Sequence, residues 1–120
     1  MICGARSRVY LAGPEVFLPD AESIGLEKQR LCNEHGFDGL FPLDASLDLT
    51  GLSKSESARR IALANEALMR SADAVIANMT PFRGASMDAG TAYEVGFMRA
   101  LGKPAAPEYA AATKTARAGA

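Results

Sequence analysis

The apolar residues of this chain gather in short continuous runs, separated by longer stretches in which they recur at helical spacing. The first run covers residues 8–12 and stops at Gly13 and Pro14, a second extends over residues 37–43, and the clearest covers residues 74–77. Short apolar runs that end in turn residues are typical of buried strands. The pattern therefore predicts three strands.

Apolar residues recur every three or four positions in the stretches that follow these runs. This spacing predicts a first helix over residues 20–36, a second that begins at Ser55 or Ser57, and a third that ends at Gly102. Strands and helices that alternate in this way form parallel sheets with right-handed crossovers. We therefore expect an α/β fold of three layers, α/β/α, with a parallel flavodoxin- or Rossmann-like sheet of four to five strands.

The predicted fold also indicates where a ligand would bind. In open parallel sheets, ligands lie beyond the carboxyl ends of the strands. Three loops should meet there, over residues 13–19, 42–53 and 78–91. We expect the functional residues to come mainly from these segments.

The end of the chain differs from the rest in composition. The whole chain of 120 residues has an ordinary size for a single globular unit. We expect one domain, and we place it over residues 1–104. Residues 105–120 are dominated by alanine, and Pro107 together with the lack of Val and Ile argues against a regular central strand. We therefore expect a divergent or disordered C-terminal tail over residues 105–120.

Charge bears on the class of partner. The chain has 13 Lys and Arg residues against 14 Asp and Glu, which gives a formal net charge of −1. Proteins that bind nucleic acids usually carry a basic excess that displaces counterions from the phosphates. We therefore expect no nucleic-acid partner. A domain this small buries a limited share of its surface, so a partner subunit is plausible.

The cysteines and the termini indicate a compartment. Cys3 and Cys32 stand apart and belong to no Cys/His cluster, which favours two free thiols over a disulfide framework or a zinc site. The N-terminal residues lack the apolar stretch of a signal peptide. No segment approaches the roughly 18 apolar residues that would span a bilayer. We expect a cytoplasmic protein without a membrane partner.

The stretch over residues 81–96 is the richest in candidate chemistry. Gly90 permits close backbone approach at a helix start, and Asp88 and Thr91 are both potential caps. Glu94 follows Asp88 by six residues. Two acidic groups so spaced can border one pocket, where one stabilises or attacks a sugar carbon while the other holds hydroxyls. An acidic residue early in a helix can equally be a dipole or capping partner without chemistry.

Three segments carry a resemblance to a known family. They are the segment Val9–Pro14 (VYLAGP), the segment Ala72–Asn78 (ADAVIAN) and the stretch Phe82–Gly96. In this order and spacing, from about residue 8 to Pro104, they resemble nucleoside 2-deoxyribosyltransferases. A lone Gly-Thr-x-x-Glu motif is weak, but the three segments in register are specific.

The resemblance implies a role for individual residues. Glu94 becomes the nucleophile, Tyr10 orients it by a hydrogen bond, and Asp88 binds the deoxyribose hydroxyls. Asn65 falls where family members carry Asp or Asn facing the base, and an Asn cannot act as a general acid. The remaining candidates for substrate binding are Phe17 and Phe82 as apolar walls, Asp44 on the base side, and the glycines Gly13 and Gly90.

The resemblance further implies the reaction. Glu94 would form a covalent 2-deoxyribosyl-enzyme, the first base would leave and a second base would attack, with no cofactor or metal required. Substrates would be deoxynucleosides and free nucleobases. Related hydrolases of deoxynucleoside 5′-monophosphates place a serine six residues before the glutamate, and Asp88 at that position would repel a phosphate.

Three alternatives stay open at this point. The first is an N-glycoside hydrolase, in which water replaces the second base. The second is the phosphoribohydrolase group, although its members have a more glycine-rich approach to the Gly-Thr-x-x-Glu motif. The third is a non-catalytic nucleoside-binding module on the same fold. In the family, a C-terminal segment helps to complete a neighbouring subunit's site, so we also expect a homo-oligomer, at least a dimer.

Overall fold

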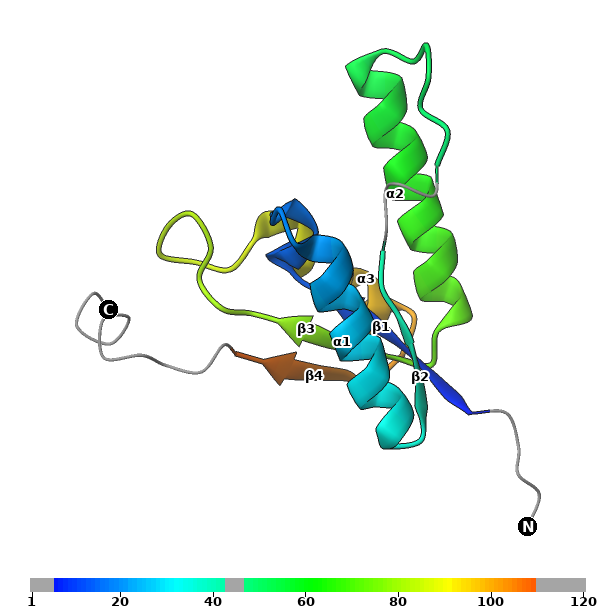
Figure 1. Ribbon diagram of the computed structural model, residues 1–120, viewed down its shortest axis with the longest axis vertical. Helices are drawn as coiled ribbons and strands as arrows, with labels where there is room; N and C mark the ends of the chain where they lie inside the picture. The colour runs from blue at the N-terminus through cyan, green and yellow to red at the C-terminus, as the bar shows by residue number, and fades with distance from the viewer. Residues whose placement is uncertain (1–5, 43–46, 110–120) are drawn as a thin grey trace.

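The computed structural model describes residues 6–42 and 47–109, in which strands and helices alternate (Figure 1). The elements are, in chain order, β1 (Ser7–Ala12), the short 3-10 helix η1 (Pro14–Phe17), α1 (Ala21–Glu34), β2 (Phe37–Leu40), α2 (Lys54–Ser71), β3 (Ala74–Asn78), α3 (Ala89–Ala100) and β4 (Ala105–Glu108). The strands and helices predicted from the apolar pattern are all present.

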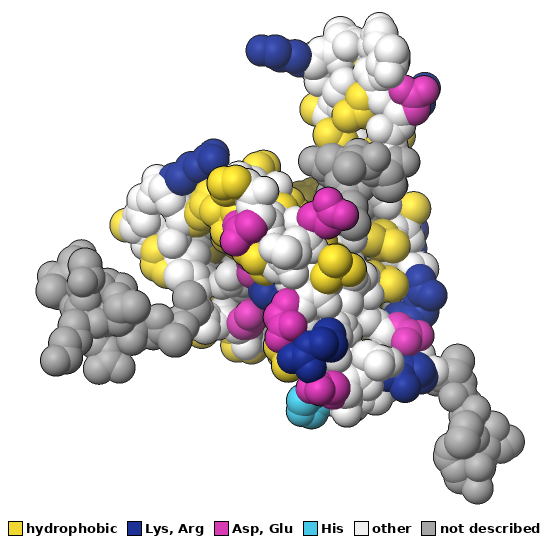
Figure 2. All heavy atoms as spheres, viewed as in Figure 1, with side chains coloured by type: hydrophobic (Ala, Val, Ile, Leu, Met, Phe, Trp, Pro, Cys, Tyr) yellow, Lys and Arg dark blue, Asp and Glu magenta, His cyan; other side chains and the backbone are white. Residues whose placement is uncertain are grey.

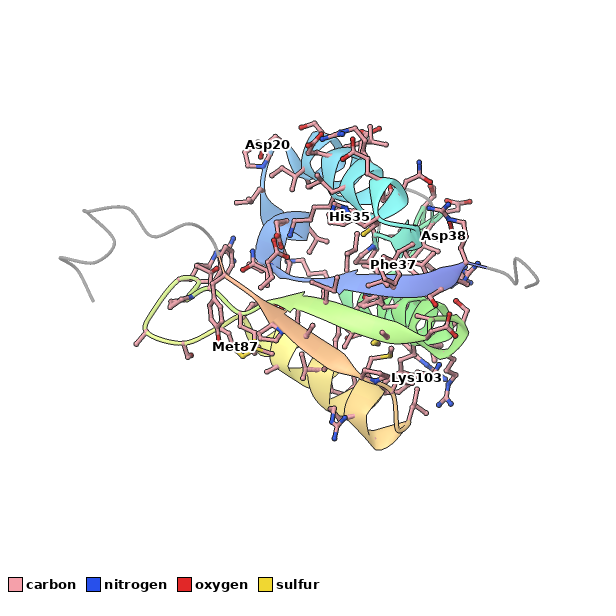
Figure 3. The ribbon with its side chains drawn as sticks, turned by 90° about the horizontal axis from the view of Figure 1, so that it is seen from below. Asp20, His35, Phe37, Asp38, Met87 and Lys103 are labelled. Carbon is pink, nitrogen blue, oxygen red and sulfur yellow. The ribbon has the colours of Figure 1, made fainter. Side chains whose placement is uncertain are left out.

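The four strands form one parallel sheet in the order β2-β1-β3-β4. In Figure 3, α1 covers one face of the sheet, and α3 lies on the opposite face together with α2. The expected three-layer α/β fold is confirmed. The direction of winding reverses between β1 and β3, and the carboxyl ends of such a strand pair are where ligands bind in folds of this kind.

Strand β1 is buried on both of its faces, and its alternate residues pack against different layers. Tyr10 is fully buried in a cluster that includes Met69 of α2 and Met98 of α3. Leu11 points to the opposite face and packs with Phe41. Because successive side chains of a strand alternate between faces, one short apolar run supplies both cores. The same alternation orients the Tyr10 side chain toward α3.

Gly25 lies within the first turns of α1, where glycine weakens an isolated helix by about 1 kcal/mol relative to alanine. The packing explains its presence. A Cβ atom at this position would lie 2.5 Å from the ring of Phe41. Gly25 therefore allows α1 to approach the loop after β2 at close range, and the contact compensates for the poor helix propensity.

The start of α2 lies slightly before the position that the sequence predicts. Ser53 is the N-cap: its hydroxyl accepts from the Glu56 amide at 3.1 Å, and the Glu56 carboxylate accepts from the Ser53 amide at 3.4 Å. This capping box starts the helix at Lys54, ahead of Ser55 and Ser57.

None of the helices in residues 6–42 and 47–109 is long and apolar enough to cross a membrane.

Strand β4 comes from residues 105–108, inside the segment that we expected to be a tail. It forms the edge of the sheet, where Pro107 is tolerated. The Val75 amide donates to the Pro104 carbonyl at 3.0 Å and the Met79 amide to the Glu108 carbonyl at 2.8 Å. The backbone N–H and C=O groups of the even-numbered residues in this segment therefore point toward β3. The nitrogen of Pro107 faces away from the ladder, and its missing N–H breaks no bond to β3.

Candidate active site

Glu94 and Tyr10 form the centre of the site. Tyr10 lies near the carboxyl end of β1 and Glu94 on the second turn of α3. The Tyr10 hydroxyl donates a hydrogen bond of 2.6 Å to Oε2 of Glu94. The pKa of Glu94 is raised above its ordinary value: burial raises it most, the Tyr10 hydrogen bond lowers it, and the charge of Asp88 raises it further. The contact predicted between these two side chains is therefore present.

Asp88 has a structural role and also lies at the site. It is the N-cap of α3, and its Oδ2 accepts from both the amide and the hydroxyl of Thr91, each at 3.0 Å. These two hydrogen bonds cap the first turn of α3. The Glu94 carboxylate, in contrast, accepts its hydrogen bond from Tyr10 on β1. Capping therefore explains Asp88 in part, but it does not explain the position of Glu94.

A pocket of about 140 Å³ opens beside the two carboxylates. Segments from all three predicted loops meet there, together with α2 and α3. Its lining residues are Gly13, Val16, Phe17, Pro42, Ile61, Asn65, Asp88, Gly90 and Glu94. The pocket lies at the carboxyl ends of the strands, as expected for a parallel sheet.

The other predicted site residues divide into three groups. Asn65 of α2, Gly13 before η1, Phe17 of η1 and Gly90 at the start of α3 all line the pocket. Phe82 is absent from that lining and packs behind one of its walls. Asp44 lies outside the described residues.

An aromatic stack supports the open side of the pocket. The rings of Phe17 and Phe82 stack with their centroids 6.0 Å apart and their planes at 23°. The guanidinium of Arg83 lies over both rings, 5.5 Å from Phe17 and 4.7 Å from Phe82. Arg83 has a φ of 54°, in the left-handed region that most residues avoid. Phe17 lines the pocket and remains 54% exposed.

The sequence analysis did not select three apolar lining residues, Val16, Pro42 and Ile61. Val16 and Pro42 fall in the predicted loops, but apolar loop residues carry no chemical signal of their own. Ile61 belongs to the apolar face of α2, which is indistinguishable from a core face in the sequence. Only the packing of α2 beside the carboxyl end of β1 reveals it as a pocket residue.

Glu15 is the other residue that the sequence analysis passed over. It follows Gly13 and Pro14 directly, and it is 6% exposed despite its charge. Its carboxylate forms an ion pair with Lys28 and accepts a hydrogen bond of 2.8 Å from Nδ2 of Asn78. A charged residue inside a predicted site loop, between apolar neighbours, is the signal that would have found it.

Comparison with known proteins adds three kinds of finding. A sequence model of a family described as nucleoside 2-deoxyribosyltransferase matches residues 9–117. An uncharacterised protein of Schizosaccharomyces pombe is 39% identical over 100 residues, which are 82% of this chain and 47% of that protein. The chain thus spans about half the length of this curated relative.

Two solved structures are similar in both sequence and fold. A 2-deoxyribosyltransferase from Leishmania mexicana superposes with a TM-score of 0.73 at 35% identity, over 86% of this chain and 64% of that one. A conserved protein from Enterococcus faecalis superposes with a TM-score of 0.63 at 26% identity, over 86% of this chain and 63% of the other.

A third structure is similar in fold alone. It is a 2-deoxyribosyltransferase from Bacillus psychrosaccharolyticus, with a TM-score of 0.69 at 18% identity, over 92% of this chain and 80% of that one.

Proposed function

The chain belongs to the nucleoside 2-deoxyribosyltransferase family, and from this premise we propose that it exchanges the base of 2′-deoxynucleosides through a covalent 2-deoxyribosyl-Glu94 intermediate. One observation carries the proposal. The Glu94 carboxylate lies at the pocket, oriented by a 2.6 Å hydrogen bond from the buried Tyr10 hydroxyl. A carboxylate held in one direction beside a sugar site is what displacement at the anomeric carbon requires.

The proposed reaction has two displacements. Because Tyr10 holds Oε2, we assign the attack to Oε1 of Glu94, which forms a bond to C1′ of the deoxyribose. The C1′–N bond breaks, and its electron pair leaves with the first base, which takes a proton from solvent. The nitrogen of a second base then attacks C1′, loses its proton and returns the carboxylate. Two inversions give net retention.

The raised pKa of Glu94 fits this role. A nucleophile must be deprotonated, yet a carboxylate that is strongly stabilised in the ground state is a poor nucleophile. Burial destabilises the charge of Glu94, and the Tyr10 hydrogen bond limits that effect. Positive charge develops on the sugar as the base departs, and the two nearby carboxylates would stabilise it electrostatically.

We propose that the substrates are free nucleosides rather than their 5′-monophosphates. Asp88 and Glu94 both line the pocket, and among the described lining residues none is Lys or Arg. A phosphate dianion there would meet two negative charges and no counter-charge. Asp88 Oδ2 is bonded to Thr91, and we assign its other oxygen to a sugar hydroxyl. The Asn65 amide and the exposed Phe17 ring would face the base.

The size of the pocket bears on assembly. A volume of about 140 Å³ is small for a whole nucleoside, because pockets for ligands of that size usually enclose about 300–1,000 Å³. We propose that the described part of one chain forms the sugar subsite and that a second subunit of a homo-oligomer completes the base subsite.

We also propose that the protein acts in nucleoside salvage in the cytoplasm.

Hydrolysis is the second candidate, and the exposure of the pocket wall favours it. Phe17 lines the pocket and is 54% exposed, so water can reach the site from that side. Water attacking the glycosyl-enzyme would release free deoxyribose in place of a new nucleoside.

One assay separates the two candidates. The purified chain is incubated with deoxyinosine and adenine, and the products are followed by chromatography. We expect new deoxyadenosine, and we expect its formation to be abolished in Glu94→Ala. Hypoxanthine without deoxyadenosine would identify a hydrolase, and a folded protein without turnover would overturn the proposed function. Deoxyinosine 5′-monophosphate, offered in the same assay, should react far more slowly.

A further inference from the structure

A polar cluster around the buried Glu15 side chain lies against Gly13 in the wall of the pocket. Its central group is the Glu15 carboxylate, which is paired with Lys28 of α1 and accepts from Asn78 at the end of β3. The Lys28 ammonium also donates to Oε1 of Glu108 on β4 at 3.0 Å. One cluster thus connects η1, α1, β3 and β4 at the carboxyl end of the sheet.

The cluster is in contact with the pocket wall itself. A Cβ atom at Gly13 would lie 2.0 Å from Oε1 of Glu15 and 2.9 Å from Cβ of Asn78. The Glu15 carboxylate therefore occupies the space that a side chain at residue 13 would need. On the other side, Gly13 lines the pocket. A shift of the carboxylate would therefore be transmitted to the backbone that faces the ligand.

The cluster also reaches the loop that leads to Asp88. Oδ1 of Asn78 accepts from the amide of Thr80 at 3.1 Å and from its hydroxyl at 2.6 Å. Thr80 begins the loop that carries Phe82, which stacks on Phe17 of η1. The Glu15–Asn78 hydrogen bond therefore connects the two loops that border the pocket.

The charges of the cluster make it sensitive to the loss of one member. The side chain of Glu15 is 8% exposed and that of Lys28 is 17% exposed. A buried carboxylate without its cationic partner is strongly disfavoured, so it moves toward water or takes up a proton. Burial lowers the pKa of Lys28, but the bonds to Glu15 and Glu108 outweigh it and raise the pKa overall. Lys28 therefore stays charged at neutral pH.

We infer that Lys28 is a positioning residue, which holds Glu15 and hence the Gly13–Phe17 segment in the conformation that receives the nucleoside. The inference rests on the proposed function. It differs from a purely structural role in its kinetic consequence. Tyr10 and Glu94 belong to β1 and α3, so a loosened η1 leaves the reacting pair in place and weakens substrate binding. General destabilisation would instead lower the fraction of active enzyme, and apparent kcat would fall at unchanged KM.

The test compares Lys28→Met with a matched variant on the same helix. Lys28→Met keeps the alkyl stem and removes the charge. Arg30→Met is the control, because Arg30 pairs with Glu27 and Glu34 on the exposed side of α1, where acidic and basic side chains lie side by side in Figure 2. We expect Lys28→Met to raise KM for deoxyinosine about tenfold with kcat changed less than about twofold. Arg30→Met should match the wild type, and Lys28→Arg should restore most of the affinity.

Hydrogen exchange gives a readout that does not depend on activity. The Leu18 amide donates to the Glu15 carbonyl at 3.0 Å and reports on η1. In Lys28→Met, we expect its exchange to become about tenfold faster than in Arg30→Met, while amides of β1 and β3 exchange at unchanged rates. If Lys28→Met does not fold, the double variant Glu15→Gln/Lys28→Met removes the buried charge of Glu15 and leaves only the 39% exposed Glu108 carboxylate without its partner. It should show the same two effects, because the ion pair that holds residue 15 is still missing.

The outcomes separate the two proposals. Unchanged KM together with unchanged exchange at Leu18 would overturn the positioning role, as would a fall in kcat at constant KM. A wild-type chain that transfers deoxyribose to no second base would refute the proposed function. The hydrogen-exchange rate of the Leu18 amide would still decide whether Lys28 orders η1.

Discussion

At the scale of single residues, the site depends on how one carboxylate is surrounded. Glu94 is half-buried and accepts a hydrogen bond from the Tyr10 hydroxyl. Asp88 is the one other acidic residue among the described residues of the pocket lining. The Tyr10–Glu94 pairing could be predicted from the sequence, because the family pattern places both residues. Val16 and Ile61 could not, because their roles arise from tertiary packing that no local pattern encodes. Glu15 carries a local signal, a charge between apolar neighbours, but its ion pair with Lys28 is visible only in the packed structure.

Tyr10→Phe tests the hydrogen bond to Glu94, the proposed nucleophile. The bond lowers the pKa of Glu94, so its removal should raise that pKa further and move the acid limb of the kcat/KM profile to higher pH. We expect kcat/KM at neutral pH to fall about 10- to 100-fold, the range for a lost hydrogen bond to a charged group. Tyr93→Phe is the control, because its hydroxyl bonds to Glu66 at 2.5 Å on the exposed surface. An unshifted acid limb in Tyr10→Phe would contradict this account.

Glu94→Gln tests how much the partly buried Glu94 carboxylate, the proposed nucleophile, destabilises the fold. Because the pKa of Glu94 is raised in the folded chain, the folded state binds this proton more tightly than the unfolded chain does. The carboxyl therefore destabilises the fold at neutral pH, and the effect disappears as pH falls below the ordinary carboxyl pKa. We expect Glu94→Gln to raise the free energy of unfolding at neutral pH and to change it by almost nothing near pH ~4. Denaturant unfolding at both pH values measures this, and a destabilised variant at neutral pH would refute it.

Arg83 combines a left-handed backbone with a stack on two aromatic rings. Arg83→Gly relieves the backbone while Arg83→Ala does not, and both remove the contacts to Phe17 and Phe82. We expect Arg83→Gly to be more stable than Arg83→Ala by about 0.5–1 kcal/mol in denaturant unfolding. Both should raise KM for the nucleoside by the same factor. Equal stability of the two variants would show that the φ of 54° costs nothing.

At the scale of elements, the apolar pattern predicted the helices α1, α2 and α3 and the first three strands, but not the short 3-10 helix η1. The other differences lie at the ends of elements. The capping box starts α2 at Lys54, and Asp20 occupies the N-cap position of α1 without a side-chain bond to the helix. The apolar pattern alone did not indicate β4, because its residues lack β propensity and contain Pro107, although a sheet of four to five strands was expected. Backbone pairing with β3 and the edge position make it a strand despite its composition.

Lys103, in the loop before β4, caps the C-terminal end of α2. Its ammonium donates to the carbonyls of Met69, Arg70 and Ala72 at 3.3, 2.7 and 2.6 Å. We expect Lys103→Met to lower the free energy of unfolding by about 1–2 kcal/mol, because the last carbonyls of the helix lose a charged donor. Ser53→Ala at the other end of α2 should cost about 1 kcal/mol. Chemical denaturation measures both, and an unchanged midpoint in Lys103→Met would contradict the capping role.

At the scale of the whole molecule, α2 extends beyond the sheet (Figure 1). Several large apolar side chains remain exposed. Leu26 is 62% exposed and Leu63 is 52% exposed. Together with the small pocket, these surfaces support the proposed homo-oligomer. We expect light scattering after size exclusion to give at least a dimer at micromolar concentration. A monomer with full base-exchange activity would contradict the proposal that a second subunit completes the site.

The central claim is that the Glu94 carboxylate bonds to the sugar, and rapid acid quenching followed by mass spectrometry tests it most directly. The chain is mixed with deoxyinosine in the absence of an acceptor base, quenched, digested and sequenced by fragmentation. We expect a peptide heavier by one 2-deoxyribosyl group, with the modification on Glu94, and no such peptide from Glu94→Gln. An active enzyme whose adduct lies on another residue would contradict it.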